Sequence, residues 1–265
     1  MKIVNIFIKT IYEKRRFVFF WCIGIMALSL LYATVYNSIN NNASLTKALE
    51  STSSGIKSLI GSADFFSTPA GFIHAELFSI TMPMILGVTA ILLGSSILNK
   101  EEETRTIELL LARPVSRHKI INQKFFGLMS IIFLLALSIV LGLWFGRLSV
   151  DVFNLDMFIT SVATFELMLI ALAFGSIALT LSAFRPNRGF AGGVTGAIFT
   201  LSYVISTFGN QIQWLRHFRY FSLFHYYDTV NILQHKFNIM NFVILVLVIF
   251  ICLGLSNILI YRRDI

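Results

Sequence analysis

The sequence predicts an all-α, polytopic membrane protein with six transmembrane helices. Of its 265 residues, 56% are hydrophobic and 13% are charged, whereas an ordinary soluble domain carries about 25% charged residues. The mean hydropathy is +0.78. The apolar residues fall in continuous blocks of about 20, the length that an α-helix needs to cross about 30 Å of hydrocarbon. A transmembrane β-barrel would instead show short strands of alternating polarity, so we expect helices.

Six apolar blocks define the expected spans. They lie at Phe17–Tyr36, Leu77–Leu98, Phe125–Phe145, Met157–Leu181, Phe190–Phe208 and Asn241–Tyr261. The long connection from residue 37 to residue 73 is rich in Asn, Ser and Thr, so we expect it to be partly disordered, with a short helix or two. Because nothing indicates a second, soluble domain, we treat residues 1–265 as a single transmembrane domain.

The distribution of basic residues indicates the orientation of the spans. One set of alternate connections holds 15 of the 21 Lys and Arg residues: Lys2, Lys9, Lys14, Arg15, Arg16, Lys100, Arg105, Arg113, Arg117, Lys119, Lys124, Arg185, Arg188, Arg262 and Arg263. Such connections face the cytoplasm, so we expect a multi-pass protein of the cell (plasma) membrane with both termini cytoplasmic. Because these residues flank the spans and form no groove-shaped face, we expect no nucleic-acid partner.

The segment before the first span has the pattern of an amphipathic helix. Its two faces are formed at helical spacing by Val4, Phe7, Ile8 and Ile11, and by Lys2, Asn5, Lys9, Glu13 and Arg16. A basic helix of this kind lies flat on the inner leaflet, held by apolar burial and by attraction to anionic membrane lipids. The alternative is that the segment extends the first span into the cytoplasm.

The connection between the second and third spans predicts a cytoplasmic helix from Asn99 to Ala112. Asn99 and Glu102 have the spacing of a capping box, and Pro114 prevents the helix from continuing. One face of this helix is apolar and is formed by Ile107, Leu110 and Leu111. Such a helix is either a docking surface for a cytoplasmic partner or an ordinary solvated loop helix.

The sequence of this connection resembles the signature of ABC-2 type permeases. Residues 101–117 read EEETRTIELLLARPVSR, and members commonly have an acidic residue, Gly-Thr, an apolar residue, Glu-Leu-Leu and then Arg-Pro-Val-Ser-Arg. The matching residues are Glu108, Arg113, Pro114, Ser116 and Arg117, whereas Arg105 stands where many members have Gly. The motif is confined to this connection, while the six-span plan covers the whole chain.

The resemblance implies a function and partners. It implies the permease subunit of an ATP-binding cassette exporter, a class that moves amphipathic or hydrophobic peptides, antibiotics or lipid-like molecules outward. The connection would be the coupling helix that seats in a cytoplasmic ATPase, with two permease subunits, identical or different, and two ATPase subunits per transporter. We assign coupling to Glu101, Glu102, Arg105, Glu108, Leu110, Leu111, Arg113, Pro114 and Arg117.

The sequence carries no phosphate-binding motif. A P-loop places Lys and then Ser or Thr after a Gly at a helix start, and none of the 16 Gly residues is followed by Lys. We therefore expect no enzyme activity and no cofactor in this chain, with ATP and Mg bound by the partner ATPase. The alternative is a secondary transporter, which would carry ionisable residues within its spans.

Glu166 is the ionisable residue that falls inside a predicted span. Its carboxyl group is either structural, hydrogen-bonded to Ser, Thr or Tyr on another span, or linked to substrate or to protons. A single carboxyl group without a basic partner is weak support for an ion-coupled carrier.

Small-residue repeats occur at the start of the fifth span. They are Gly189/Gly193 and Gly192/Gly196, with a weaker pair, Gly142/Gly146, in the third span. Repeats of this spacing let another helix approach closely. The other helix belongs either to the same chain or, as the resemblance slightly favours, to a second permease subunit.

The outer segment Gln211–Asn238 interleaves aromatic and charged residues, which predicts short helices at the outer interface. It is expected to act as an interfacial anchor, or alternatively as a gate for substrate. An intramembrane enzyme is a further alternative, with the candidates His217, His225, His235, and His74 with Glu76. Their spacing lacks the usual metal-ligand patterns. The last alternative is a membrane signalling or immunity protein without a transport cycle.

The orientation predicts a labelling pattern. In a background without native cysteines, Ser53→Cys and Lys236→Cys should react with an impermeant thiol reagent in intact cells, whereas Arg105→Cys and Arg188→Cys should not, because they face the cytoplasm. Labelling of the latter pair from outside would reverse the orientation and remove the coupling assignment.

Overall fold

The computed structural model describes residues 6–40, 68–103, 117–150, 153–185, 187–209, 212 and 215–261. These residues contain no strand, which confirms the all-α class. The long helices are α1 (Ile6–Asn40), α6 (Met82–Glu103), α8 (Arg117–Ser149), α9 (Met157–Phe184), α10 (Arg188–Phe208) and α12 (Ile239–Tyr261). The short elements are α5 (Pro69–Ile73), the π-helix η1 (His74–Thr81), the 3-10 helices η2 (Leu215–Phe221) and η3 (Leu223–Tyr226), and α11 (Thr229–Leu233).

Six helical stretches among the described residues are long and apolar enough to cross a membrane, which confirms the predicted number of spans. They are Ile6–Ser38, Pro69–Leu98, His118–Ser149, Met157–Phe184, Arg188–Phe208 and Ile239–Ile260. The first stretch begins at Ile6, before its predicted start at Phe17, and the second begins at Pro69, before its predicted start at Leu77, because α5, η1 and α6 follow one another without a gap. Hydropathy did not indicate these first turns, since they include His74 and Glu76.

Polar side chains cap the starts of two spans. The Asp156 carboxylate accepts hydrogen bonds from the amides of Phe158 and Ile159 at 3.0 and 3.3 Å. The Asn187 side-chain oxygen accepts one from the Phe190 amide at 3.0 Å. Such caps satisfy amide groups that have no acceptor inside the helix, so α9 and α10 begin directly after these two residues.

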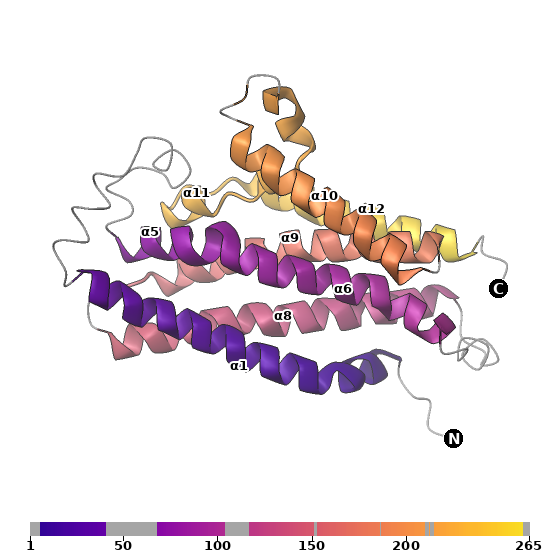
Figure 1. Cartoon of the computed structure of the whole chain (residues 1–265), viewed down its shortest axis with the longest axis horizontal. Helices are drawn as coiled ribbons and strands as arrows, with labels where there is room; N and C mark the ends of the chain where they lie inside the picture. Colours follow the sequence, from indigo (N-terminus) through magenta and orange to yellow (C-terminus); the bar gives the residue numbers. More distant parts are fainter. Residues whose placement is uncertain are drawn as a thin grey trace.

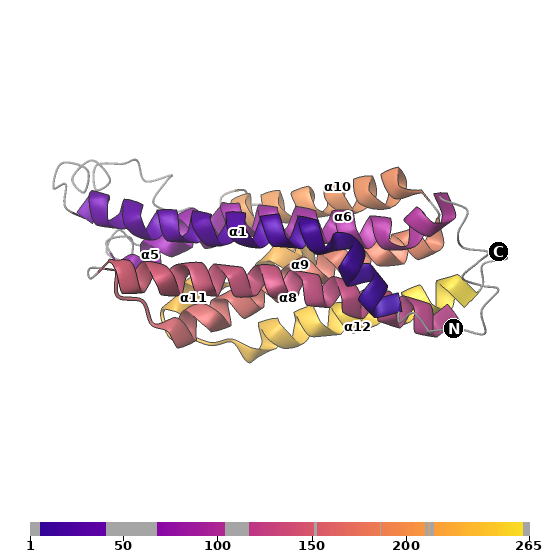
Figure 2. The same cartoon turned by 90° about the horizontal axis from the view of Figure 1, so that it is seen from below.

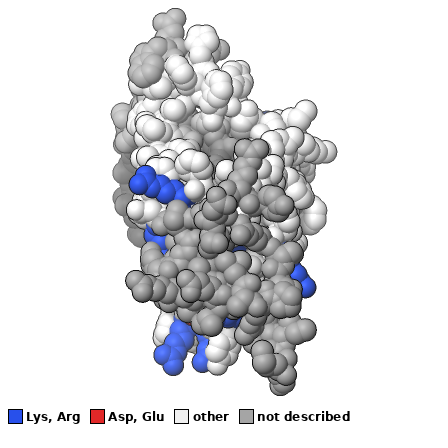
Figure 3. Space-filling view, turned by 90° about the vertical axis from the view of Figure 1, so that its right-hand side faces the viewer, with Lys and Arg blue, Asp and Glu red and all other residues white. Residues whose placement is uncertain are grey.

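The long helices run side by side along the long axis of the molecule, and α10 crosses the others at an angle (Figure 1). The start of α1 and the end of α12 lie at the same end of the bundle, together with the end of α6 and the start of α8. Figure 3 looks onto this end, and the coloured side chains in that view are Lys and Arg. We call it the basic end; it is formed by the starts of α1, α8 and α10 and the ends of α6, α9 and α12.

The central helix of the bundle is α9. It contacts α6, α8, α10, α11 and α12, and 19 of its 28 residues are buried. Small side chains let the other helices approach it closely. At the closest approach, a Cβ atom added to Gly94 of α6 would lie 2.3 Å from the carbonyl oxygen of Gly175 of α9.

A second close contact joins α1 to α8. A Cβ atom on Gly142 would lie 2.6 Å from the Met26 carbonyl oxygen, and one on Gly146 would lie 2.5 Å from the Ala33 Cβ atom. The Gly142/Gly146 pair therefore serves close packing within the chain.

The Gly94–Gly175 approach predicts a selective loss of stability. Gly94→Ala should lower the free energy of unfolding by about 1–3 kcal/mol, because the added methyl group meets backbone that cannot move aside. Gly24→Ala is the matched control, since a Cβ atom on Gly24 would meet no described atom within 4 Å and the substitution gains helix propensity of up to about 1 kcal/mol. Thermal unfolding in detergent compares the two, and equal midpoints would contradict the packing.

Candidate functional site

The connection assigned to ATPase coupling joins α6 to α8 at the basic end of the bundle. Six of its assigned residues lie outside the described part of the chain: Arg105, Glu108, Leu110, Leu111, Arg113 and Pro114. Glu101 and Glu102 lie in the last turn of α6, and Arg117 is the first residue of α8. The predicted position of the connection, between the second and third spans, therefore agrees with the two helices that flank it.

No new helix begins at Asn99, contrary to the capping-box prediction. The helix α6 passes through Asn99 without a break and ends at Glu103. Lys and Glu are good helix formers, and neither Gly nor Pro follows Leu98 before this end. The second span therefore continues into the predicted coupling segment, and its own last turn carries Glu101 and Glu102.

The N-terminal segment is the first part of α1 rather than a separate helix. Figure 2 shows that these first turns bend away from the rest of α1 and cross α8. The amide of Ile6 donates a hydrogen bond to Gln123 Oε1 at 3.2 Å, and a Cβ atom on Gly127 would lie 2.9 Å from the Thr10 methyl group. The segment is thus held on α8, and its position at the membrane interface stays a prediction.

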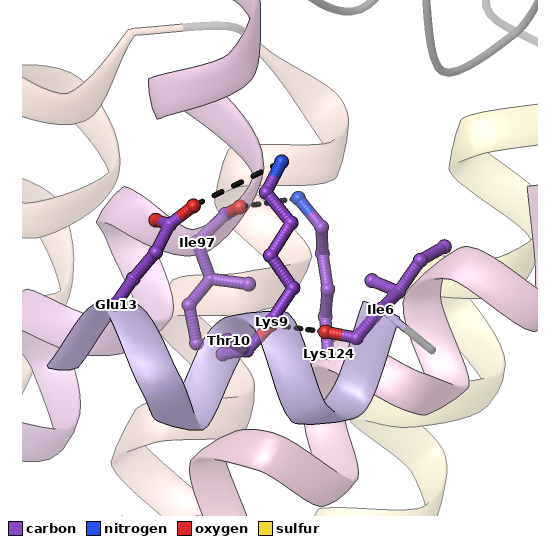
Figure 4. Close-up of polar contacts among 6 residues, drawn as sticks. All are labelled: Ile6, Lys9, Thr10, Glu13, Ile97 and Lys124. Atoms are coloured by element: carbon purple, nitrogen blue, oxygen red, sulfur yellow. Dashed lines mark hydrogen bonds and ion pairs between the residues drawn. The ribbon is translucent and has the colours of Figure 1, made fainter. Parts of the chain in front are cut away.

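A buried lysine lies where α1, α6 and α8 meet. Lys124 of α8 is 2% exposed, and its Nζ atom donates a hydrogen bond to the Ile97 carbonyl oxygen of α6 at 2.6 Å. Figure 4 shows this bond beside the ion pair between Lys9 and Glu13, whose atoms are 3.8 Å apart. A cavity of about 30 Å³ lies between them, lined by Lys9, Thr10, Glu13, Lys14, Ser96, Ile97 and Lys124.

Glu166 is buried in α9, toward the end of the bundle opposite the basic end. It is 1% exposed, and its Oε2 atom accepts a hydrogen bond from the backbone amide of Asp228 at 3.0 Å. The sequence predicted a structural hydrogen bond to another part of the bundle, such as a Ser, Thr or Tyr side chain on another span. The observed partner is instead backbone of the outer segment, which no pattern in the sequence indicates.

Two further hydrogen bonds tie the outer segment to the π-helix η1. The Tyr227 hydroxyl donates to the Phe78 carbonyl oxygen at 2.8 Å, and His74 Nδ1 and Thr229 Oγ1 share a hydrogen bond of 3.0 Å. Burial, and to a smaller extent the Glu166 carboxylate, raises the pKa of Tyr227 well above its usual value, so its phenol stays a donor. A π-helix is uncommon and often marks a functional site, and here its backbone and His74 hold the outer segment.

An aromatic cluster anchors the same segment. Phe224 of η3 is 5% exposed, and its ring lies 5.7, 5.2 and 5.2 Å from the rings of Phe174, Phe199 and Tyr203. Ring pairs at these distances attract one another beyond their burial. The outer segment therefore enters the bundle at η3, while η2 exposes the aromatic side chains Phe218, Tyr220 and Phe221.

The candidate histidines are not brought together as a metal site. Within the described ranges, no group of three or more His, Cys, Asp and Glu residues is placed to hold a metal ion. The His225 ring packs against the rings of Tyr220 and Tyr226, with both centroid distances at 5.1 Å. Burial, followed by the nearby Arg219 cation, lowers the pKa of His225, which favours a neutral ring.

The glycines of α10 have few neighbours within the chain. A Cβ atom on Gly192 would lie 3.4 Å from Ser95 Oγ of α6, whereas Gly193 and Gly196 have nothing within 4 Å. Gly189 meets only the side chain of the adjacent cap, Asn187, at 3.2 Å. Close packing inside the described chain therefore accounts for one of the four glycines, Gly192.

A comparison with protein families decides the identity of the chain. The family model described as ABC-2 family transporter protein matches residues 4–265. The chain belongs to this family. It is therefore a permease component of an ABC transporter, and ABC-2 permeases generally act with an ATPase on a separate subunit. A search among curated proteins gives no match.

The contact between Glu166 and the Asp228 amide in this ABC-2 permease predicts different effects for two substitutions. Glu166→Gln should retain the fold and the outer segment, because the amide oxygen still accepts a hydrogen bond. Glu166→Leu should destabilise by about 1–3 kcal/mol, because it leaves a buried amide without an acceptor. Hydrogen exchange over residues 228–233 measures the effect, and slow exchange in Glu166→Leu equal to that of the natural chain would contradict a structural role.

Proposed function

We propose that this permease is the membrane subunit of an exporter that moves amphipathic or hydrophobic peptides, antibiotics or lipid-like molecules outward. A separate cytoplasmic ATPase dimer supplies the energy and binds ATP and Mg, and this chain holds no cofactor. The observation that carries the proposal is that the 104–116 connection joins the end of α6 to the start of α8, and that both of these helix ends lie at the basic end. Because basic ends face the cytoplasm, this position supports contact with a cytoplasmic ATPase.

The two flanking helices support a mechanical role for the connection. Both α6 and α8 pack against the central α9, so a displacement of the connection by the ATPase passes into the bundle through two rigid helices. The apolar face at Leu110 and Leu111 seats in the ATPase, and the charges of Glu108 and Arg113 orient the contact, since rim charges give specificity more than affinity.

A second permease subunit completes the proposed transporter. A Cβ atom on Gly193 or Gly196 of α10 would have nothing within 4 Å among the described residues, although each glycine belongs to a four-residue repeat, Gly189/Gly193 or Gly192/Gly196, that is typical of close helix contacts in membranes. Val204, which lies on the same face of this helix by its spacing from Gly193 and Gly196, is 40% exposed. This face supports a dimer through α10, with the substrate path between the subunits.

The coupling proposal predicts separate effects on binding and on transport. Replacing Leu110 and Leu111 together by Asp should abolish co-purification of the ATPase with a tagged permease, because two carboxylates would be buried without partners. Glu108→Ala or Arg113→Ala should leave the complex largely assembled and weaken export relative to ATP hydrolysis.

The matched control is Leu148→Asp, which places the same charge at the opposite end of the bundle on a side chain that is 63% exposed. It should retain the ATPase. Retention of the ATPase by the Leu110/Leu111 double variant at the level of the natural chain would remove the coupling assignment.

A further inference from the structure

Lys124 carries a charge on the buried face of α8. Its neighbours one turn away on the same face, Ile121 and Leu128, are 0% exposed, and Lys124 itself is 2% exposed. Removing an ammonium group from water is costly, and an apolar residue of similar volume is often as stabilising or more so. Stability alone therefore does not account for a lysine at this position.

The acceptor of this lysine lies close to the predicted coupling segment. In an α-helix the carbonyl of residue 97 also accepts the amide of Glu101, so the Lys124 ammonium lies beside the last turns of α6, which ends at Glu103. Cations are favourable near the C-terminal end of a helix. The 104–116 connection follows α6 and is followed by α8, which begins at Arg117, two turns before Lys124. One side chain thus connects the helices at both ends of the segment.

The first turns of α1 join the same junction. On either side of Lys124 in α8, Gln123 accepts a hydrogen bond from the Ile6 amide of α1, and Gly127 lets Thr10 of α1 approach closely. The cavity of about 30 Å³ at this junction has room for water. A close-packed core resists movement, and this junction is less closely packed than the core around α9.

We propose that Lys124 is a positioning residue of the coupling apparatus, a clamp that makes α6, α8 and the start of α1 move together when the 104–116 segment is displaced. The clamp rests on the proposed function, because it presumes that an ATPase acts on this segment. It also includes the N-terminal segment, so that the first span moves with the second and third. Without the clamp, the end of α6 moves independently of α1.

The clamp is tested first in the full-length chain alone, in lipid nanodiscs. Spin labels on Tyr12→Cys of α1, which is 61% exposed, and on Glu103→Cys at the end of α6 report the distance across the junction. The labelled natural chain and Lys124→Arg should give one narrow distance distribution, because both keep a cation at the Ile97 carbonyl. Lys124→Met should broaden the distribution, whereas Lys119→Met, which removes an exposed charge from the same helix, should leave it narrow.

The second measurement uses the complex with the co-purifying ATPase. Lys124→Met should retain the ATPase as the natural chain does, but the permease-dependent part of ATP turnover should fall about 5-fold or more, the low end of usual coupling strengths. Lys124→Arg and Lys119→Met should keep most of the permease-dependent ATP turnover. A purely structural lysine would change thermal stability without this selective loss of turnover.

Three results would overturn the inference. They are a narrow distance distribution in Lys124→Met, unchanged permease-dependent turnover in that variant, or loss of the bound ATPase, which would make Lys124 a docking residue. If Lys124→Met does not fold, a broad distribution in the folded Lys124→Arg would also overturn it. If the natural chain retains no ATPase, the proposed function fails, and the spin-label distances still decide whether the clamp exists.

Discussion

The bundle depends on the close approach of helices to α9. Lipid tails are as apolar as leucine, so helices in a membrane associate through packing and hydrogen bonds rather than through the hydrophobic effect. In this permease the backbones of α6 and α9 come together at Gly94 and Gly175. The helices α8, α10 and α12 also contact α9, whereas α1 reaches the bundle mainly through α8. Most side chains on α9 are therefore buried by the rest of the chain.

This central position explains the chemistry around Glu166. A buried carboxyl group needs hydrogen-bond donors, and in the membrane water does not supply them. The outer segment supplies the Asp228 amide, and Phe224 fills the space between α9 and α10. The hydrogen bond from the Asp228 amide gives the carboxyl group a donor. This bond and the aromatic contacts of Phe224 together fix the outer segment on the bundle. The outer segment is thus part of the core rather than a loop over it.

Charged rather than apolar contacts characterise the basic end of the bundle. Charged residues gather there because the helices leave the hydrocarbon, and the junction of α1, α6 and α8 holds Lys9, Glu13 and Lys124 around a small cavity. Close packing through glycine dominates along α1 and α8, and charged contacts dominate where they approach α6. Close backbone packing therefore characterises the length of the bundle, and polar contacts around a small cavity characterise its basic end.

The all-α class, the number of spans and the ABC-2 family can be recognised from the sequence alone. These properties depend on composition and on patterns among residues close together in the sequence, so each can be recognised without the structure. Patterns of the same kind also indicated the outer segment and the small-residue repeats. It misplaced a helix start at Asn99, because the capping pattern was weaker than the tendency of α6 to continue through Lys and Glu.

Only the tertiary structure decided how these elements meet. Gly142 and Gly146 pack against another helix of the chain, whereas Gly189 and Gly193 meet no other helix among the described residues, although both pairs are four residues apart in the sequence. The hydrogen bond from the Asp228 amide to Glu166 spans 62 residues, and that from Lys124 to the Ile97 carbonyl spans 27. Such contacts depend on which faces of distant helices come together, and that arrangement is set by packing across the whole bundle rather than by the residues on either side.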